Sequence, residues 1–257
     1  MIEVKHISKS FDGRSILNDI SAQFFDGKTN LIIGKSGSGK TVLMKSIVGL
    51  LRPDSGEVLY DGKDFLRMNA AEIKTLRSEI GMLFQGSALF DSLTVLENVM
   101  FPLKMFTRQS AAEREKRARF CIERVNLSGA DKQYPSEISG GMQKRVAIAR
   151  AIALNPRYLF CDEPNSGLDP QTSILIDELI RDITREYNIT TIINTHDMSS
   201  VLGIGENIIF LNQGQKEWVG NKDDLFTSTN EKLNNFVFAS NLFKTVKKYI
   251  DHSRTKE

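Results

Sequence analysis

Cysteine is scarce in this sequence, and its placement gives no disulfide framework. The two cysteines, Cys121 and Cys161, lie far apart and form no CxxC motif, which favours reduced and buried thiols. No apolar run approaches the ~20 residues that cross a bilayer, and Met1 to His6 lack the apolar core of a signal peptide. We therefore expect a cytosolic protein without a transmembrane segment, which reaches any membrane through a partner.

An excess of charge of either sign is also missing. The 34 lysine and arginine residues nearly balance the 32 aspartate and glutamate residues, so the net charge is +2. This net charge does not indicate nucleic-acid binding, which would require a local basic patch. The 257 residues, of which 40% are hydrophobic, suit one large α/β domain or a core with an inserted subdomain.

A glycine-rich loop is the first motif that indicates a function. It consists of Gly34, Lys35, Ser36, Gly37, Ser38, Gly39, Lys40 and Thr41. The loop fits GxxxxGK[ST], follows the apolar run from Leu31 to Ile33 and opens a helix predicted from Lys40 to Leu51. The glycines let backbone N–H groups surround phosphate oxygens, and the helix N-terminus adds positive potential. Lys40 can neutralise the β- and γ-phosphates, and the Thr41 hydroxyl can bind Mg²⁺.

A buried strand that ends in carboxylates provides the second motif. Tyr158 to Asp162 is predicted as that strand, and Glu163 follows directly. Asp162 would hold Mg²⁺, directly or through water, and Glu163 would polarise the attacking water as a general base. Acidic residues are common at strand ends, so this assignment depends on the glycine-rich loop upstream.

A second candidate anion site lies between these two motifs. Ser139, Gly140 and Gly141 precede a helix predicted from Met142 to Leu154, with Ser139 as its N-cap. The simple interpretation is a capped helix after a turn. The functional one is an anion site made by bare glycine N–H groups at a helix N-terminus. Two phosphate sites far apart in one sequence suggest that each serves a different nucleotide.

Strand-like and helical segments alternate along the chain, which predicts an α/β fold with a largely parallel, covered sheet. We expect a single domain over 1–257, with its catalytic core in 1–86 and 155–228. Between these parts, 87–154 is predicted as an inserted helical subdomain. Its helices are expected at Thr94–Phe106 and Ala111–Val125.

The end of the chain has a different pattern. Apolar residues recur at helical spacing from Glu231 to Ile250, and the last residues are basic. The segment 229–257 is therefore predicted as a helical C-terminal extension that packs on its own core or on a second subunit. A helix lying on a membrane surface is the alternative.

In this order, the motifs resemble those of the ATPase subunit of an ATP-binding cassette (ABC) transporter, over essentially the whole chain. The resemblance makes Gly34–Thr41 the Walker A loop, Phe160–Glu163 the end of Walker B and Ile138–Gln143 the ABC signature. It implies a P-loop ATPase core whose mixed, largely parallel sheet is joined by antiparallel N-terminal strands. It also implies ATP and Mg²⁺ as the ligands.

Three further residues and one short segment gain a role only from the resemblance. Gln85 matches the Q-loop glutamine, which reaches Mg²⁺ and the water, and His196 matches the switch histidine at the γ-phosphate. Ser166–Asp169 matches the D-loop. Phe11 stands where most members stack a tyrosine on adenine, and it keeps the stacking face.

The resemblance also implies a mechanism and partners. Two copies would close head to tail over two ATP molecules, with Walker A of one chain and the signature of the other around each γ-phosphate. An integral membrane permease would bind and move the transported substrate, and no nucleic-acid partner is expected. The chain would then be peripheral, on the cytoplasmic face of the inner membrane.

One departure from the family pattern narrows the subfamily. Met142 stands where the signature commonly has Gln, and Met cannot donate a hydrogen bond to nucleotide. Met142 and the run Gly81–Val99 resemble the ATPase of the Mla, or Mce-type, phospholipid transport system. That resemblance implies lipid transport between the inner and outer membranes, a permease with a lipid-binding Mce protein, and in some systems a STAS-type subunit.

Two alternatives remain open from the sequence. The first is the ATPase of another ABC transporter, for amino acids, metals or lipoproteins. The second is a non-transport ABC protein, in cell-division signalling or iron–sulfur assembly.

Overall fold

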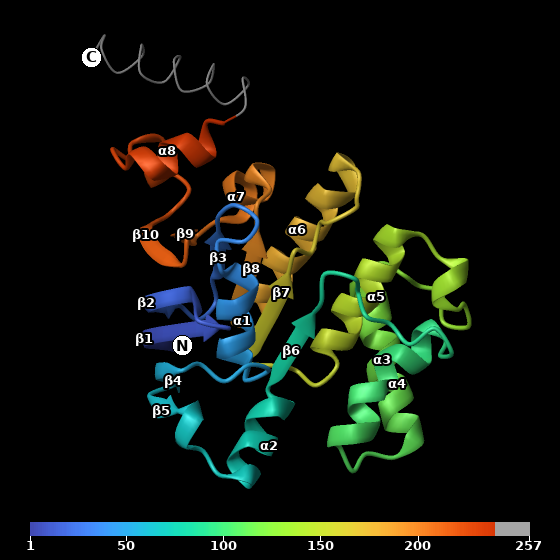
Figure 1. Cartoon of the computed structure of the whole chain (residues 1–257). Helices are drawn as coiled ribbons and strands as arrows, with labels where there is room; N and C mark the ends of the chain where they lie inside the picture. Colours follow the sequence, from blue (N-terminus) through green and yellow to red (C-terminus); the bar gives the residue numbers. More distant parts are fainter. Residues whose placement is uncertain (240–257) are drawn as a thin grey trace.

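The computed structural model describes residues 1–239, which form two β-sheets with helices packed between and around them (Figure 1). The strands are β1 (Ile2–Phe11), β2 (Arg14–Phe24), β3 (Thr29–Ile33), β4 (Ser55–Tyr60), β5 (Lys63–Asp64), β6 (Ile80–Leu83), β7 (Tyr158–Asp162), β8 (Thr190–Thr195), β9 (Asn207–Asn212) and β10 (Gln215–Gly220). The smaller sheet is antiparallel, in the order β2-β1-β4-β5. The larger sheet has the order β10-β9-β3-β8-β7-β6; β9 to β6 pair in parallel, and β10 pairs antiparallel with β9.

The helices fall into two groups. The α-helices of the described residues are α1 (Lys40–Val48), α2 (Ala70–Ser78), α3 (Val95–Phe106), α4 (Ala111–Arg124), α5 (Gly140–Ile152), α6 (Pro170–Glu186), α7 (Met198–Ile204) and α8 (Glu231–Val237). Helices α3, α4 and α5 pack on one another at one side of the molecule, whereas the others accompany the sheets (Figure 1). Thr94 and Ser110 open α3 and α4 with capping boxes, which explains why these helices begin where they do.

Successive side chains of the large sheet point to opposite faces, so each central strand contributes residues to two hydrophobic cores. Ile32, Phe160 and Ile192 share one core with α1 and the antiparallel sheet. Their neighbours Leu31 and Leu159 belong to a second core, which continues through α3 to α6. Because both faces are buried, the register of each strand is strongly specified, and the carboxyl ends of β3, β7 and β8 are held side by side.

The predicted α/β fold, with a largely parallel sheet and antiparallel N-terminal strands, is confirmed. Both cysteines are buried and free, as expected. The pattern missed β5, β6, α2 and β10. Helix α1 ends at Val48 rather than Leu51, because Gly49 adopts a left-handed conformation as its C-cap. The helix predicted for Glu231–Ile250 lies partly outside the described residues, within which α8 is found.

Among residues 1–239, no helix is both long enough and apolar enough to cross a bilayer.

Candidate functional site

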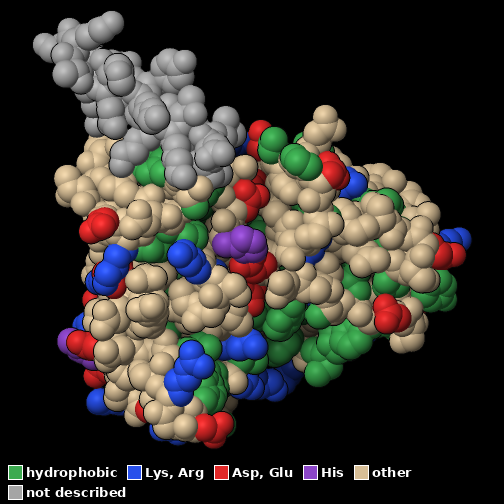
Figure 2. All heavy atoms as spheres, turned by 45° about the horizontal axis from the view of Figure 1, so that its top comes forward, with side chains coloured by type: hydrophobic (Ala, Val, Ile, Leu, Met, Phe, Trp, Pro, Cys, Tyr) green, Lys and Arg blue, Asp and Glu red, His purple; other side chains and the backbone are tan. Residues whose placement is uncertain are grey.

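The carboxyl ends of the central strands surround a cavity of about 820 Å³. It is lined by Phe11, Ile16, Lys35, Ser36, Gly37, Gly39, Lys40, Thr41, Val42, Gln85, Glu163, His196, Met198, Phe236, Val237 and Ala239. Open α/β sheets bind ligands at this edge. Figure 2 looks toward it, and a histidine and acidic side chains lie together near the middle of the face. The structure thus brings residues from both ends of the chain to one cavity.

The glycine-rich loop has the geometry of an anion cradle. Gly34 and Gly39 have φ values of +152° and +105°, and a Cβ at Gly34 would collide with the Leu211 carbonyl oxygen and the Ser38 hydroxyl. Gly39 is the N-cap of α1 and supplies no side-chain cap, so the helix N-terminus keeps backbone N–H groups for a ligand. The Ser38 hydroxyl is buried without a hydrogen-bond partner in the described structure. These features fit a phosphate group.

The Lys40 side chain folds back onto the first residues of this loop. Its Nζ donates to the carbonyl oxygens of Gly34, at 2.8 Å, and of Lys35, at 3.2 Å. It also lies 3.9 Å from a carboxylate oxygen of Glu163. Burial lowers the pKa of Lys40, and the charges of Glu163 and Asp162 oppose that effect. The loop therefore places one buried cation where phosphate charge would be neutralised.

Two oxygen ligands of the kind that Mg²⁺ prefers lie next to each other, one on Thr41, which lines the cavity, and one on its neighbour Asp162. The Thr41 hydroxyl donates to Asp162 Oδ1 at 3.3 Å. Asn194, from β8, donates to the same oxygen at 3.0 Å. One carboxylate and one hydroxyl leave room for phosphate oxygens and waters, which complete Mg²⁺ coordination in nucleotide sites. Asn194 was not predicted, because only the pairing of β7 with β8 brings it to Asp162.

Glu163 has a strained backbone that aims its side chain into the cavity. Its φ is +50°, in the left-handed region that side chains other than glycine rarely adopt. Its N–H donates to the Asn194 carbonyl at 3.0 Å, which holds this turn. The carboxylate lies 2.7 Å from Nδ1 of His196, and the His196 side chain is 64% exposed. The two residues therefore form an acid–imidazole pair beside Lys40.

The loop around Gln85 is held by α5. Gln85 is exposed and lines the cavity. The buried Lys144 donates to the Gln85 carbonyl, and Arg150 donates to the carbonyls of Ser87 and Ala88, both at 2.7 Å. Ser87 and Ala88 both have positive φ, so the cations hold a strained turn. The sequence pattern did not reveal this contact between α5 and the Gln85 loop.

The second predicted phosphate site lies apart from the first. Ser139, Gly140 and Gly141 line a separate cavity of about 350 Å³, together with Gly167, Leu168 and Asp169, and the two cavities share no lining residue. The Ser139 hydroxyl accepts a hydrogen bond from the Met142 N–H at 3.3 Å, which confirms the predicted N-cap. The Met142 side chain packs on the helical core.

A buried polar network connects the loops that follow β7 and β8. Asn165 donates to Asp177 of α6 at 2.8 Å and to Ser200 of α7 at 3.0 Å. Burial raises the pKa of Asp177 to about 6, although hydrogen bonds from Ser200 and Asn165 oppose this. The network begins two residues after Glu163 and was not predicted, because Asn165, Asp177 and Ser200 come from three separate parts of the chain.

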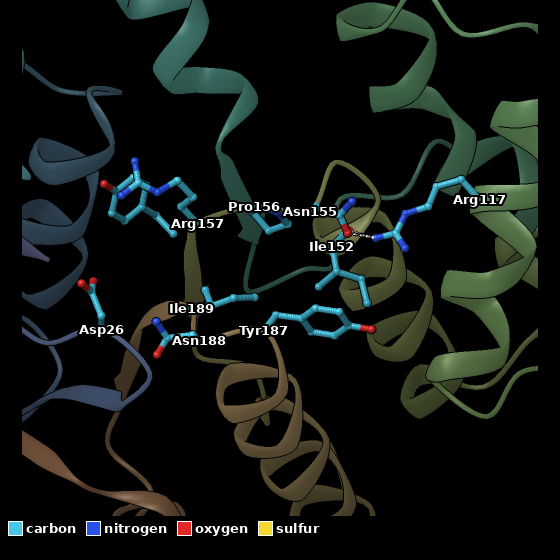
Figure 3. A pocket seen from close by; sticks show the side chains of 10 residues that line it. Asp26, Arg117, Ile152, Asn155, Pro156, Arg157, Tyr187, Asn188 and Ile189 are labelled. Atoms are coloured by element: carbon cyan, nitrogen blue, oxygen red, sulfur yellow. Dashed lines mark hydrogen bonds between the residues drawn. The ribbon is translucent and has the colours of Figure 1, made fainter.

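Another cavity, of about 310 Å³, lies at the amino ends of β7 and β8 (Figure 3). Its arginines are already engaged by the protein. Arg117 donates to the Ile152 and Ala153 carbonyls, both at 2.9 Å, and to the Asn155 side chain. Arg157 pairs with Asp61 and lies 3.6 Å from Glu79. The cavity therefore has the wrong chemistry for a phosphate site and lies at the opposite end of the strands.

Comparison with known proteins agrees with the geometry of the site. The ABC transporter family matches residues 17–166. A probable ribonucleotide transport ATP-binding protein of Mycobacterium leprae is 37% identical, over 92% of this chain and 68% of its own length. The methionine import ATP-binding protein of Campylobacter jejuni is 37% identical, over 92% of this chain and 75% of its length.

Solved structures lead to the same family. A dimeric structure of the bacterial ABC transporter cassette MJ0796 superposes with a TM-score of 0.79 at 33% identity, over 86% of this chain and 99% of that one. A second structure of that cassette holds ADP and phosphate in a post-hydrolysis state. The chain belongs to the ABC transporter family and is an ATP-binding ATPase of that family. It spans about two thirds of the length of the mycobacterial relatives.

Proposed function

We propose that this chain hydrolyses ATP in a site that it shares with a second copy of itself. The observation that carries the proposal is the separation of the two phosphate sites. Lys40 and Ser139 line different cavities of one chain, so one chain alone cannot place both around the same γ-phosphate. A head-to-tail dimer brings the cavity of Ser139 onto the glycine-rich loop of its partner. The dimeric MJ0796 cassette supports this arrangement.

The residues of the main cavity then have distinct roles. Backbone N–H groups of residues 34–39 and the Lys40 ammonium bind the β- and γ-phosphates, and Phe11 stacks on the adenine. Thr41, Asp162 and Gln85 hold Mg²⁺, which supplies charge neutralisation between the phosphates.

The acid–imidazole pair acts on the attacking water. Glu163 accepts the proton of the attacking water, and His196 positions that water at the γ-phosphate. The 2.7 Å contact between them supports a paired role, since each restricts the orientation of the other.

Replacement of Glu163 by Gln tests the proposed hydrolysis. The variant keeps the size of the side chain and loses the base, so we expect ATP binding to remain and turnover to fall at least about a hundredfold. Size-exclusion chromatography with Mg²⁺ and ATP should show a trapped dimer. Brisk hydrolysis by this variant would show that Glu163 is not the base.

A membrane permease is the proposed partner, with the chain peripheral on the cytoplasmic face of the membrane. Phe90 and Phe101 are partly exposed, with ring centroids 4.6 Å apart, and the neighbouring Met105 and Phe106 are 62% and 41% exposed. Hydrophobic side chains are visible on the helical side of the face in Figure 2. Exposed apolar side chains that gather in this way are typical of a protein contact.

We further propose that the transported substrate is a phospholipid, which moves between the bacterial inner and outer membranes. The proposed partners are an Mce-type lipid-binding protein and, in some assemblies, a STAS-type subunit. The support is the resemblance carried by Gly81–Val99 and Met142. The second candidate is import of a small solute, because relatives at about the same identity are named for ribonucleotide transport and for methionine import.

Purification of the intact complex distinguishes the two candidates. The tagged chain is extracted from its native membranes in mild detergent, and proteins and lipids are identified by mass spectrometry. A permease with an Mce-type protein and phospholipid supports lipid transport. A permease with a soluble solute-binding protein moves the assignment to import and leaves the ATPase mechanism unchanged.

A further inference from the structure

The C-terminal helix α8 reaches the nucleotide cavity of its own chain. Phe236, Val237 and Ala239 line the same cavity as Phe11 and the glycine-rich loop, although more than 190 positions separate them from that loop in the sequence. None of the roles assigned above uses these residues. In Figure 1, α8 lies above β9 and β10.

The anchoring of α8 is specific. Asn230 accepts the Leu233 N–H at 2.9 Å as the N-cap and donates to the Glu217 carbonyl of β10 at 3.0 Å. Leu233 and Val237 are buried in the core. The Asn230 hydrogen bond and the buried apolar face therefore fix the helix on the sheet, and Phe236 lies at the cavity.

Phe236 joins α8 to the glycine-rich loop through β9. Its ring stacks on Phe210 with a centroid distance of 5.3 Å and an interplanar angle of 26°. Phe210 pairs with Ile33, the residue directly before Gly34, and the next residue of β9, Leu211, approaches Gly34 with its carbonyl. One strand thus supports both the phosphate loop and the aromatic side chain of α8.

We propose that α8 is part of the nucleotide site, with the Phe236 ring as an apolar wall that contacts the base or sugar of the bound nucleotide. The inference rests on the proposed nucleotide site. The phosphates go to the glycine-rich loop, so the base and sugar are the parts that an apolar wall can contact. Binding and the seating of α8 on the sheet then stabilise each other, because coupling between two such events is reciprocal. Helix α8 thereby becomes an element that responds to nucleotide binding.

Calorimetric titration of the full chain with ATP and Mg²⁺ tests this wall. All variants carry Glu163→Gln, so that binding is measured without turnover. Phe236→Ala should weaken binding about tenfold, which corresponds to about 1.4 kcal/mol. Phe236→Tyr keeps the ring and should bind within about twofold of the parent. Lys232→Ala is the matched control on α8, because Lys232 is exposed, pairs with Glu217 and does not line the cavity.

Hydrogen exchange supplies a readout that does not depend on a mutation. In the Glu163→Gln parent, amides of residues 231–237 should exchange more slowly when ATP and Mg²⁺ are added. An unchanged rate in α8, or a Phe236→Ala variant that binds as tightly as the parent, overturns the inference. If the parent itself binds no ATP, and Lys40→Ala changes nothing, the proposed nucleotide site fails and this inference fails with it.

Discussion

Replacement of Asp177 by Asn should stabilise the protein, and increasingly so as the pH rises. Asp177 is a carboxylate that is 6% exposed, and its contacts are the amide of Asn165 and the hydroxyl of Ser200. Asp197 raises the pKa of Asp177 further, and Arg181 lowers it. An amide at 177 can accept the hydrogen bond of Asn165 without bringing a charge into the core.

The magnitude follows from the pKa of Asp177, which rises from 3.8 to about 6 on folding. The folded state holds the proton up to about pH 6 and the unfolded state only to about pH 4, so the folded state binds more protons between these values. The stability contributed by the neutral carboxyl is therefore lost as the pH rises through this window. The full effect is about 3 kcal/mol, of which about 2 kcal/mol falls between about pH 4.5 and pH 7.5.

Urea unfolding of the wild type and of Asp177→Asn at several pH values measures this difference. We expect the stability advantage of the variant to grow by about 2 kcal/mol across that range. Asp182→Asn is the matched control, since Asp182 lies on the same helix and its side chain is 55% exposed. Parallel pH curves for wild type and Asp177→Asn would refute the reasoning.

Two further predictions concern the phosphate loop. Gly34→Ala should reduce ATP affinity at least about tenfold, because a Cβ there collides with the Leu211 carbonyl at a positive φ; equal affinity in a titration would contradict the cradle geometry. Thr41→Ala should leave metal-free ATP binding unchanged and remove most of the affinity gained on adding Mg²⁺, because it deletes one of the metal's oxygen ligands. Titrations with and without EDTA measure this difference, and an unaltered Mg²⁺ effect would exclude Thr41 as a ligand.

The parts of the site that could be predicted from the sequence are those built by local geometry. The loop from Gly34 to Thr41 bends and opens a helix within a few residues, so its pattern alone indicates a phosphate cradle. Ser139 as an N-cap is equally local, and the structure confirms it. The roles expected for Gln85 and His196 came from family resemblance and remain predictions, although both residues do line the cavity.

The parts that could not be predicted depend on strand order and packing. Asn194 reaches Asp162 only because β8 pairs with β7, and Lys144 reaches Gln85 only because α5 packs beside β6. In the same way, Phe236 enters the cavity because α8 folds back over β9. No spacing in the sequence encodes these contacts, since each joins elements brought together by the whole core. The segments that the pattern missed carry little apolar signal: α2 and β10 each contain only two large apolar residues, β6 has four residues and β5 has two.

The central claim is that each ATP is hydrolysed between two chains, and Ser139→Arg tests it most directly. Ser139 lies in a cavity separate from Lys40, so a bulky cation there should leave ATP binding by one chain unchanged. The same side chain should obstruct the partner's nucleotide when two chains close. The measurement is ATP affinity and turnover of the purified variant: the shared site predicts wild-type affinity with turnover reduced at least about a hundredfold. Wild-type turnover by Ser139→Arg would contradict it.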